Sequence, residues 1–178
     1  MRRSTRLIAG FGLAALLVSG CARREAPPAP APPAPPVRAE PLPLASADYV
    51  ATASSIDLLV VRAADMAATR SSSARLRDLA AMLRRDHVGV SAQLSFAGRR
   101  LNLLPSATLQ PRHQAMLDEI AAASDFDAAW KRVMIAVHEQ GVRVHGDFAR
   151  AGASPTLRPV AEVAFPAMRR HLDELRGL

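Results

Sequence analysis

A few histidines and aspartates carry most of the reactive chemistry in this sequence. Asp57 comes first, Asp86 and His87 are adjacent, and His138 and His171 follow far along the chain. Imidazole and carboxylate groups are ligands that zinc, iron and copper accept in proteins. If folding brings them together, Asp57, His87, His138 and His171 offer a site for one of these ions, with Asp86 beside it to orient a ligand.

The same residues also have a structural interpretation, which the sequence favours. Polar groups buried between helices usually bond to one another, and His–Asp or His–backbone hydrogen bonds would hold the register of neighbouring helices. The metal site therefore stands as the alternative to a buried hydrogen-bond network.

Known catalytic patterns are missing. Di-iron bundles need two Glu-x-x-His motifs, and no histidine in the sequence has a glutamate three residues before it. His138-Glu139 fails as a zinc-protease motif because Val142 stands where the second histidine belongs. There is no glycine-rich phosphate loop and no Gly-x-Ser-x-Gly. We predict no catalytic residue; the sequence leaves the question of enzymatic activity open and favours its absence.

The remaining histidines and the methionines receive plainer interpretations. We expect His113 and His145 at the surface or at the boundary of the core. The later methionines, at helical spacing, are expected to fill the core; they are Met66, Met82, Met116, Met134 and Met168.

Helices must position these side chains. Apolar residues recur at alternating three- and four-residue spacing, as on one face of a packed helix. The pattern predicts long helices over residues 47–70, 74–97, 125–150 and 156–176, a short helix over 111–122 and a loop over 99–111. Short joins between long helices predict an all-α antiparallel four-helix bundle, with the short helix placed before the third long one.

Capping residues set the expected ends of these helices. A serine among residues 71–73 should cap the second long helix and Gly98 should end it. Ser124, with Asp127 three residues later, should cap the third. Ser154 and Pro155 should begin the fourth, and Pro166 should kink it.

The first part of the chain has the composition of an export signal. Arginines precede a short apolar run that ends before Cys21, the only cysteine, as in a lipidated bacterial leader. We predict a lipoprotein signal peptide over residues 1–21, a Pro/Ala-rich linker over 22–45 and a bundle domain over 46–178. The linker composition favours an extended polyproline spacer.

Charge argues against a nucleic-acid partner. The net charge is +7, but residues 46–178 hold 17 basic and 14 acidic side chains, so the bundle domain is only about +3. No basic stripe with interleaved aromatic residues is present. Arginine pairs such as Arg84-Arg85 are expected on solvated faces, where they could contact anionic lipid or an envelope polymer.

Several short motifs together resemble a known family. In chain order they are Asp57, Asp86-His87, Phe126-Asp127 with Trp130, His138, and Pro166 followed by His171. This arrangement resembles domain-of-unknown-function family 4142, exported bacterial proteins often described as outer-membrane proteins, over about residues 46–176. The resemblance implies a ferritin-like bundle. The family usually has glutamate at the position of Asp57 and tyrosine at that of Trp130, and its name implies no activity.

The sequence thus predicts a non-enzymatic, lipid-anchored protein of the cell envelope with a binding or structural role. The alternative is a metal-binding or redox protein that uses the core histidines and Asp57. Ala22 after Cys21 favours the outer membrane, with the domain facing the periplasm. Beyond the membrane anchor, an envelope polymer or a protein would be the partner. The ligand and the oligomeric state do not follow from the sequence.

Overall fold

The structure is a computed structural model that describes residues 45–178, and every long regular element in this range is a helix. The helices are α1 (Ser46–Arg70), α2 (Ala74–Arg99), α3 (Pro111–Ala122), α4 (Phe126–Ala151) and α5 (Arg158–Arg176). Each predicted helix is present, with its ends within two residues of the expected positions. The predicted leader, including Cys21, and the predicted linker as far as residue 44 lie outside the described residues.

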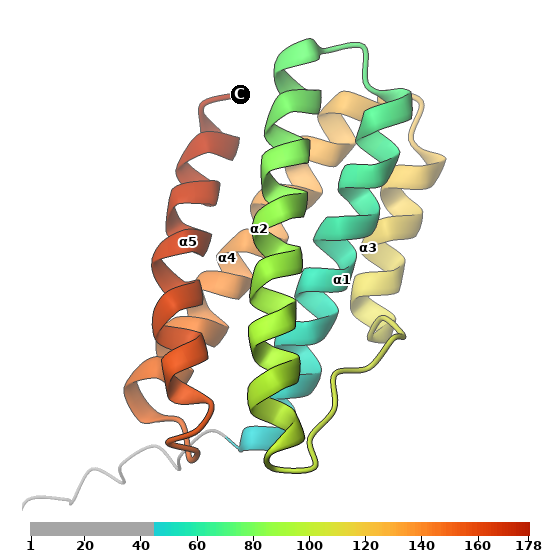
Figure 1. Cartoon of the computed structure of the whole chain (residues 1–178). Coiled ribbons are helices and arrows are strands. Elements are labelled where there is room, and N and C mark those ends of the chain that lie inside the picture. The colour runs from blue at the N-terminus through green and yellow to red at the C-terminus, as the bar shows by residue number, and fades with distance from the viewer. Residues whose placement is uncertain (1–44) are drawn as a thin grey trace, which may run out of the picture. The chain divides into compact units, whose positions relative to one another are not determined.

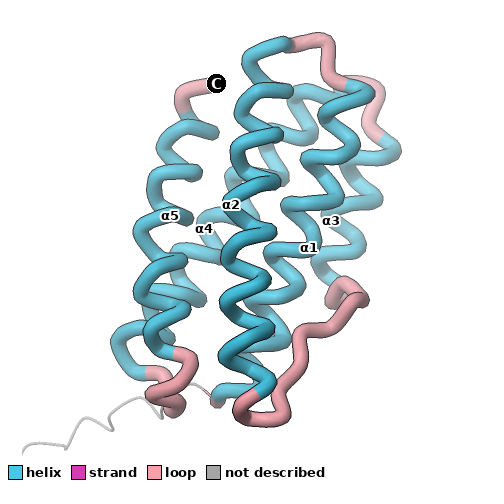
Figure 2. The backbone as a smooth tube through the Cα atoms, in the orientation of Figure 1, coloured by secondary structure: helices cyan, strands magenta, loops and turns pink. Residues whose placement is uncertain are grey.

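Four long helices form the bundle and the short one covers its side. α1 packs against α2 and α4 against α5 as two antiparallel hairpins, and α1 also contacts α4 while α2 contacts α5 (Figure 1). α3 lies against α1 and α4 and is reached through the long loop after α2 (Figure 2). The expected all-α antiparallel bundle with its extra short helix is confirmed. In the described range, no helix has the length and apolar character to cross a membrane.

The core consists of two apolar clusters along the bundle axis. One surrounds Trp130, whose indole N–H donates to the carbonyl of Ala63 at 2.9 Å. The other surrounds Tyr49 and Phe148, whose rings stack with centroids 3.8 Å apart. The predicted face of α1 is buried throughout; it comprises Tyr49, Ala53, Ile56, Val60, Ala63 and Ala67. The helical spacing of apolar residues therefore identified the core face correctly.

One of the three expected N-caps is confirmed and two were wrong. Ser73 caps α2 by accepting the N–H of Leu76 at 3.2 Å. Ser154 accepts the N–H of Leu157 at 3.3 Å, but this bond closes the turn before α5, whose N-cap is Leu157 without a side-chain cap, so the expected start at Ser154 was wrong. The cap of α4 is Asp125 and not Ser124, because the Asp125 carboxylate accepts the N–H of Ala128 at 3.1 Å. A charged acceptor is the better partner for the positive end of the helix.

Gly98 does not end α2 as expected. The helix continues to Arg99, and Gly98 lies in its last turn, where its carbonyl accepts the N–H groups of Leu101 and Leu103 at 2.9 Å. A Cβ on Gly98 would lie 2.1 Å from the Leu103 carbonyl oxygen. The loop therefore approaches α2 too closely for any residue with a Cβ at position 98. The left-handed backbone conformation occurs instead at Asn102 in the loop, with φ of 55°.

A buried hydrogen-bond clamp holds the long loop and α3 to α1. The Ser55 hydroxyl accepts the N–H of Gln110 at 2.8 Å and lies 2.7 Å from His113 Nδ1. The other ring nitrogen, Nε2, lies 3.1 Å from the Gln140 side-chain oxygen on α4. Ser55 and His113 are buried, so these bonds replace those that water would make.

The Ser55→Ala variant is expected to lower the free energy of unfolding by about 1–3 kcal/mol, because it leaves two buried polar groups without a partner. Ser54→Ala is the matched control, since the Ser54 hydroxyl bonds only to the Ala51 carbonyl within the same helix. Urea denaturation of both variants measures the difference. Equal stability of the two variants would contradict a clamp centred on Ser55.

Candidate metal centre

A layer of histidines lies in the bundle core. His87 on α2, His138 on α4 and His171 on α5, here called the histidine triad, are each at most 2% exposed. Their ring centroids are 5.3, 5.5 and 5.6 Å apart, so the rings form a nearly equilateral triangle. Each ring offers a nitrogen, and these three nitrogens lie within 4.8 Å of one another. No triad member belongs to either apolar cluster.

An oxygen atom lies next to the outer nitrogen of each ring of the triad. His87 Nδ1 lies 2.8 Å from Asp57 Oδ1, and His171 Nε2 lies 2.9 Å from Asp86 Oδ2. His138 Nδ1 donates to the carbonyl of Met134, one turn earlier on its own helix, at 2.7 Å. Histidines that bind metal ions usually have the second ring nitrogen held in this way by a carboxylate or a backbone carbonyl.

The opposite nitrogens face the centre of the triangle. His87 Nε2 and His138 Nε2 are 3.3 Å apart, and His171 Nδ1 has no hydrogen-bond partner in the described part of the chain. A lone pair on each of two facing nitrogens would be repulsive unless a proton or a cation lies between them. The geometry therefore suits either one shared proton or one metal ion.

Burial keeps the triad neutral. It lowers the pKa of His87 to about 3, and the pKa values of His138 and His171 also fall, chiefly through burial. Burial raises the pKa of Asp57 well above its ordinary value, with a smaller opposing effect from the Ser91 hydroxyl. Neutral imidazoles are the protonation state that metal ions require.

Asp57 lies behind His87, outside the group of three converging nitrogens. Its Oδ2 has no hydrogen-bond partner among the described residues, and the side chain lines a pocket of about 230 Å³ together with Ser54 and Ser91. Asp86, expected to serve the site as an orienting residue, bonds to His171 across the α2–α5 interface and not to its neighbour His87. Both aspartates thus lie where they orient a ring.

The expected surface or boundary positions of His113 and His145 were wrong, because both side chains are fully buried. His145 Nδ1 lies 3.1 Å from the Tyr49 hydroxyl, and burial lowers its pKa to about 3, with a smaller effect of His87. The spacing of seven residues between His138 and His145 puts both on one face of α4, a signal that could have predicted the burial.

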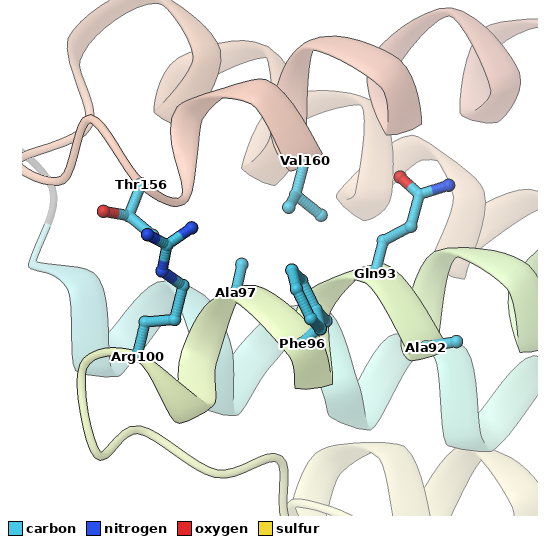
Figure 3. Close-up of a pocket in the computed structure, with 7 residues that line it drawn as sticks. All are labelled: Ala92, Gln93, Phe96, Ala97, Arg100, Thr156 and Val160. Atoms are coloured by element: carbon cyan, nitrogen blue, oxygen red, sulfur yellow. The ribbon is translucent and has the colours of Figure 1, made fainter.

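A separate pocket of about 400 Å³ opens on the surface between α2 and the start of α5 (Figure 3). Phe96, Arg100 and Val160 are among its lining residues, and Phe96 is 69% exposed. None of the seven labelled residues is a histidine, cysteine or carboxylate, so this pocket has no side chain that favours a metal ion.

Comparisons with known proteins agree with this architecture. A family model described as "Domain of unknown function (DUF4142)" matches residues 31–178. The search of curated proteins finds no match.

Among solved structures, the chain is similar to CopM in the Cu(II)-bound form, with a TM-score of 0.65, 16% identity, and coverage of 76% of this chain and 96% of that one. For CopM in the Cu(I)-bound form the values are 0.62, 16%, 74% and 92%. A DUF305 fragment from Deinococcus radiodurans gives 0.63, 17%, 74% and 92%. At these identities the likeness establishes a shared fold.

The buried histidines should make the bundle sensitive to acid. His87 and His145 have a pKa of about 3 in the folded chain, against 6.5 as the ordinary value, so the unfolded chain binds more protons between these limits. Each of these two histidines then lowers the free energy of unfolding by roughly 1.4 kcal/mol per pH unit as the pH falls below 6.5. Asp57 acts in the opposite sense, because its raised pKa lets the folded chain hold an extra proton above pH 3.8.

Urea denaturation at several pH values between 7 and 4.5 should therefore show that the free energy of unfolding decreases steadily as the pH is lowered. His145→Gln removes one of the contributing groups without touching the triad, so its profile should be shallower. A flat profile for the unmodified protein would show that the histidines do not titrate on unfolding.

Proposed function

The chain belongs to the DUF4142 family, and we propose that its bundle binds one transition-metal ion at the histidine triad. The observation that carries the proposal is the arrangement of the three rings. In each, one nitrogen bonds to an oxygen on the outside, while another nitrogen lies within 4.8 Å of its counterparts. A metal site requires that its rings are held from outside while one nitrogen of each ring is directed toward a common point.

Copper is the ion that the proposal favours, and zinc is second. Imidazole suits both ions, and divalent copper binds nitrogen sites more tightly than zinc. CopM, whose fold this chain shares, is described in Cu(II)-bound and Cu(I)-bound forms. Iron is less suited, because the triad includes no glutamate, and Asp57 and Asp86 bond to its rings from outside. The proposed role is binding without catalysis.

Proton exchange accompanies binding in this proposal. In the metal-free protein burial raises the pKa of Asp57, which favours its protonated form. A cation next to His87 favours the carboxylate form of Asp57, so binding of the ion displaces this proton toward solvent. The hydrogen-bond network that supports the helices in the absence of metal is thus the same network that orients the ligands.

Purified protein should take up one copper or zinc ion per chain. His138→Gln should abolish this stoichiometric binding, because it removes one converging nitrogen. His145→Gln is the matched control, a buried histidine on the same helix whose removal leaves the triad intact. Metal content after dialysis, together with the rise in melting temperature on metal addition, provides the measurement.

A wild-type protein that stays metal-free after loading with copper and zinc would contradict the proposal. The triad would then serve only to hold the helices in register.

Asp57→Asn should weaken metal binding by about 10- to 100-fold, because the amide orients His87 less well and carries no charge. Ser54→Ala alters the same pocket without contacting His87, so its affinity should match that of the wild type. Competition with a chromophoric chelator measures both affinities. Unchanged affinity in Asp57→Asn would show that the carboxylate does not support the ligand.

We further propose that the domain is tethered to the outer membrane and faces the periplasm. The support is the sequence before the described residues, in which an apolar run leads to Cys21 and a Pro/Ala-rich segment follows. A tether would keep a metal-binding domain close to the membrane while the segment gives it reach.

Cys21→Ser should abolish fatty-acid incorporation and shift the protein from the membrane fraction to the soluble fraction. Growth of a bacterial host with a labelled fatty acid, followed by fractionation, tests this. Label that persists in the Cys21→Ser variant would contradict lipidation at Cys21.

A further inference from the structure

Met168 differs from the other buried methionine of the bundle. Met134 packs within the apolar cluster around Trp130, whereas Met168 is fully buried yet belongs to neither apolar cluster. Met168 precedes His171 by three residues on α5, so the two side chains lie on the same face, one turn apart. Its thioether therefore lies about one helical turn from the histidine layer.

A glycine on the facing helix makes room for this thioether. Gly141 follows His138 by three residues on α4, and α4 packs along α5. A Cβ on Gly141 would lie 3.0 Å from Met168 Sδ and 3.4 Å from its Cγ. The sulfur thus rests against a backbone that lacks a side chain, one turn from two members of the triad.

We propose that Met168 Sδ is the fourth ligand of the ion at the histidine triad and makes the site selective for Cu(I). This inference rests on the proposed function, since it needs an ion at the triad. A methionine side chain has three rotatable bonds, so the thioether can turn from Gly141 toward the ring nitrogens without movement of the backbone.

Ligand chemistry favours Cu(I) over zinc at such a site. Thioether sulfur is a soft ligand that selects Cu(I), while zinc sites use thiolate, imidazole or carboxylate. Three neutral imidazoles and a neutral thioether carry no charge themselves, and the nearest negative charge lies behind them, on the carboxylates that hold His87 and His171. Burying a single positive charge costs less than burying two, and the site is closed to solvent.

The experiment compares Met168→Leu with Met134→Leu in full-length protein that also carries Cys21→Ser, so that the only thiol does not bind copper. Leucine keeps the volume and apolar character of methionine but has no sulfur. Cu(I), kept reduced with ascorbate, and Zn(II) are each titrated against a competing chelator. We expect Met168→Leu to lower Cu(I) affinity by roughly tenfold or more and Zn(II) affinity by less than about threefold. Met134→Leu should change neither.

X-ray absorption at the copper edge gives a second, direct reading. Selenomethionine-labelled protein loaded with Cu(I) should show a copper–selenium distance in the Cys21→Ser background, and Met168→Leu should lose it. Cu(I) binding of equal strength in Met168→Leu, or an absent copper–selenium distance, would overturn the role of Met168 and leave the metal triad standing. Parallel loss of Cu(I) and Zn(II) in Met168→Leu would overturn it too, as a packing defect. Absence of both ions from the parent protein would overturn the proposed function itself.

Discussion

Imidazole rings buried between helices need partners, and this requirement shapes the middle of the bundle. Each ring nitrogen without a hydrogen bond loses its interaction with water on folding, at a cost of about 1–3 kcal/mol. The chain meets the requirement by pairing His87 with Asp57, His171 with Asp86 and His138 with the Met134 carbonyl. The nitrogens left over face one another, and a bound ion would satisfy them together.

The apolar clusters give this layer its rigidity. Close-packed side chains around Trp130 and around Tyr49 and Phe148 leave the helices little freedom to shift. The three rings of the triad come from α2, α4 and α5, and Asp57 comes from α1, so the positions of the rings depend on all four long helices at once. A site built this way is preorganised, so an ion that bound there would cost little conformational entropy.

Electrostatics and function are linked through the same contacts. Burial lowers the pKa of the histidines, so their rings are neutral, as a metal ligand has to be, and it raises the pKa of Asp57. The half-exposed Asp86 bonds to His171 near the surface, while the buried Asp57 bonds to His87. The two carboxylates therefore contact different rings of the triad. Membership of the DUF4142 family implies no activity. The proposal of metal binding therefore rests on the geometry of these contacts.

The sequence by itself determined the helices and the core face, because helix formation and amphipathic spacing depend on residues three and four positions apart. It also identified Asp57, His87, His138 and His171 as the candidate metal ligands. Only the tertiary structure decided which nitrogens converge, that Asp86 serves His171 and not its neighbour, that His113 and His145 are buried, and that Met168 rests on Gly141. Those facts depend on the rotation of each helix about its axis and on contacts between residues up to 96 positions apart, which local spacing does not encode.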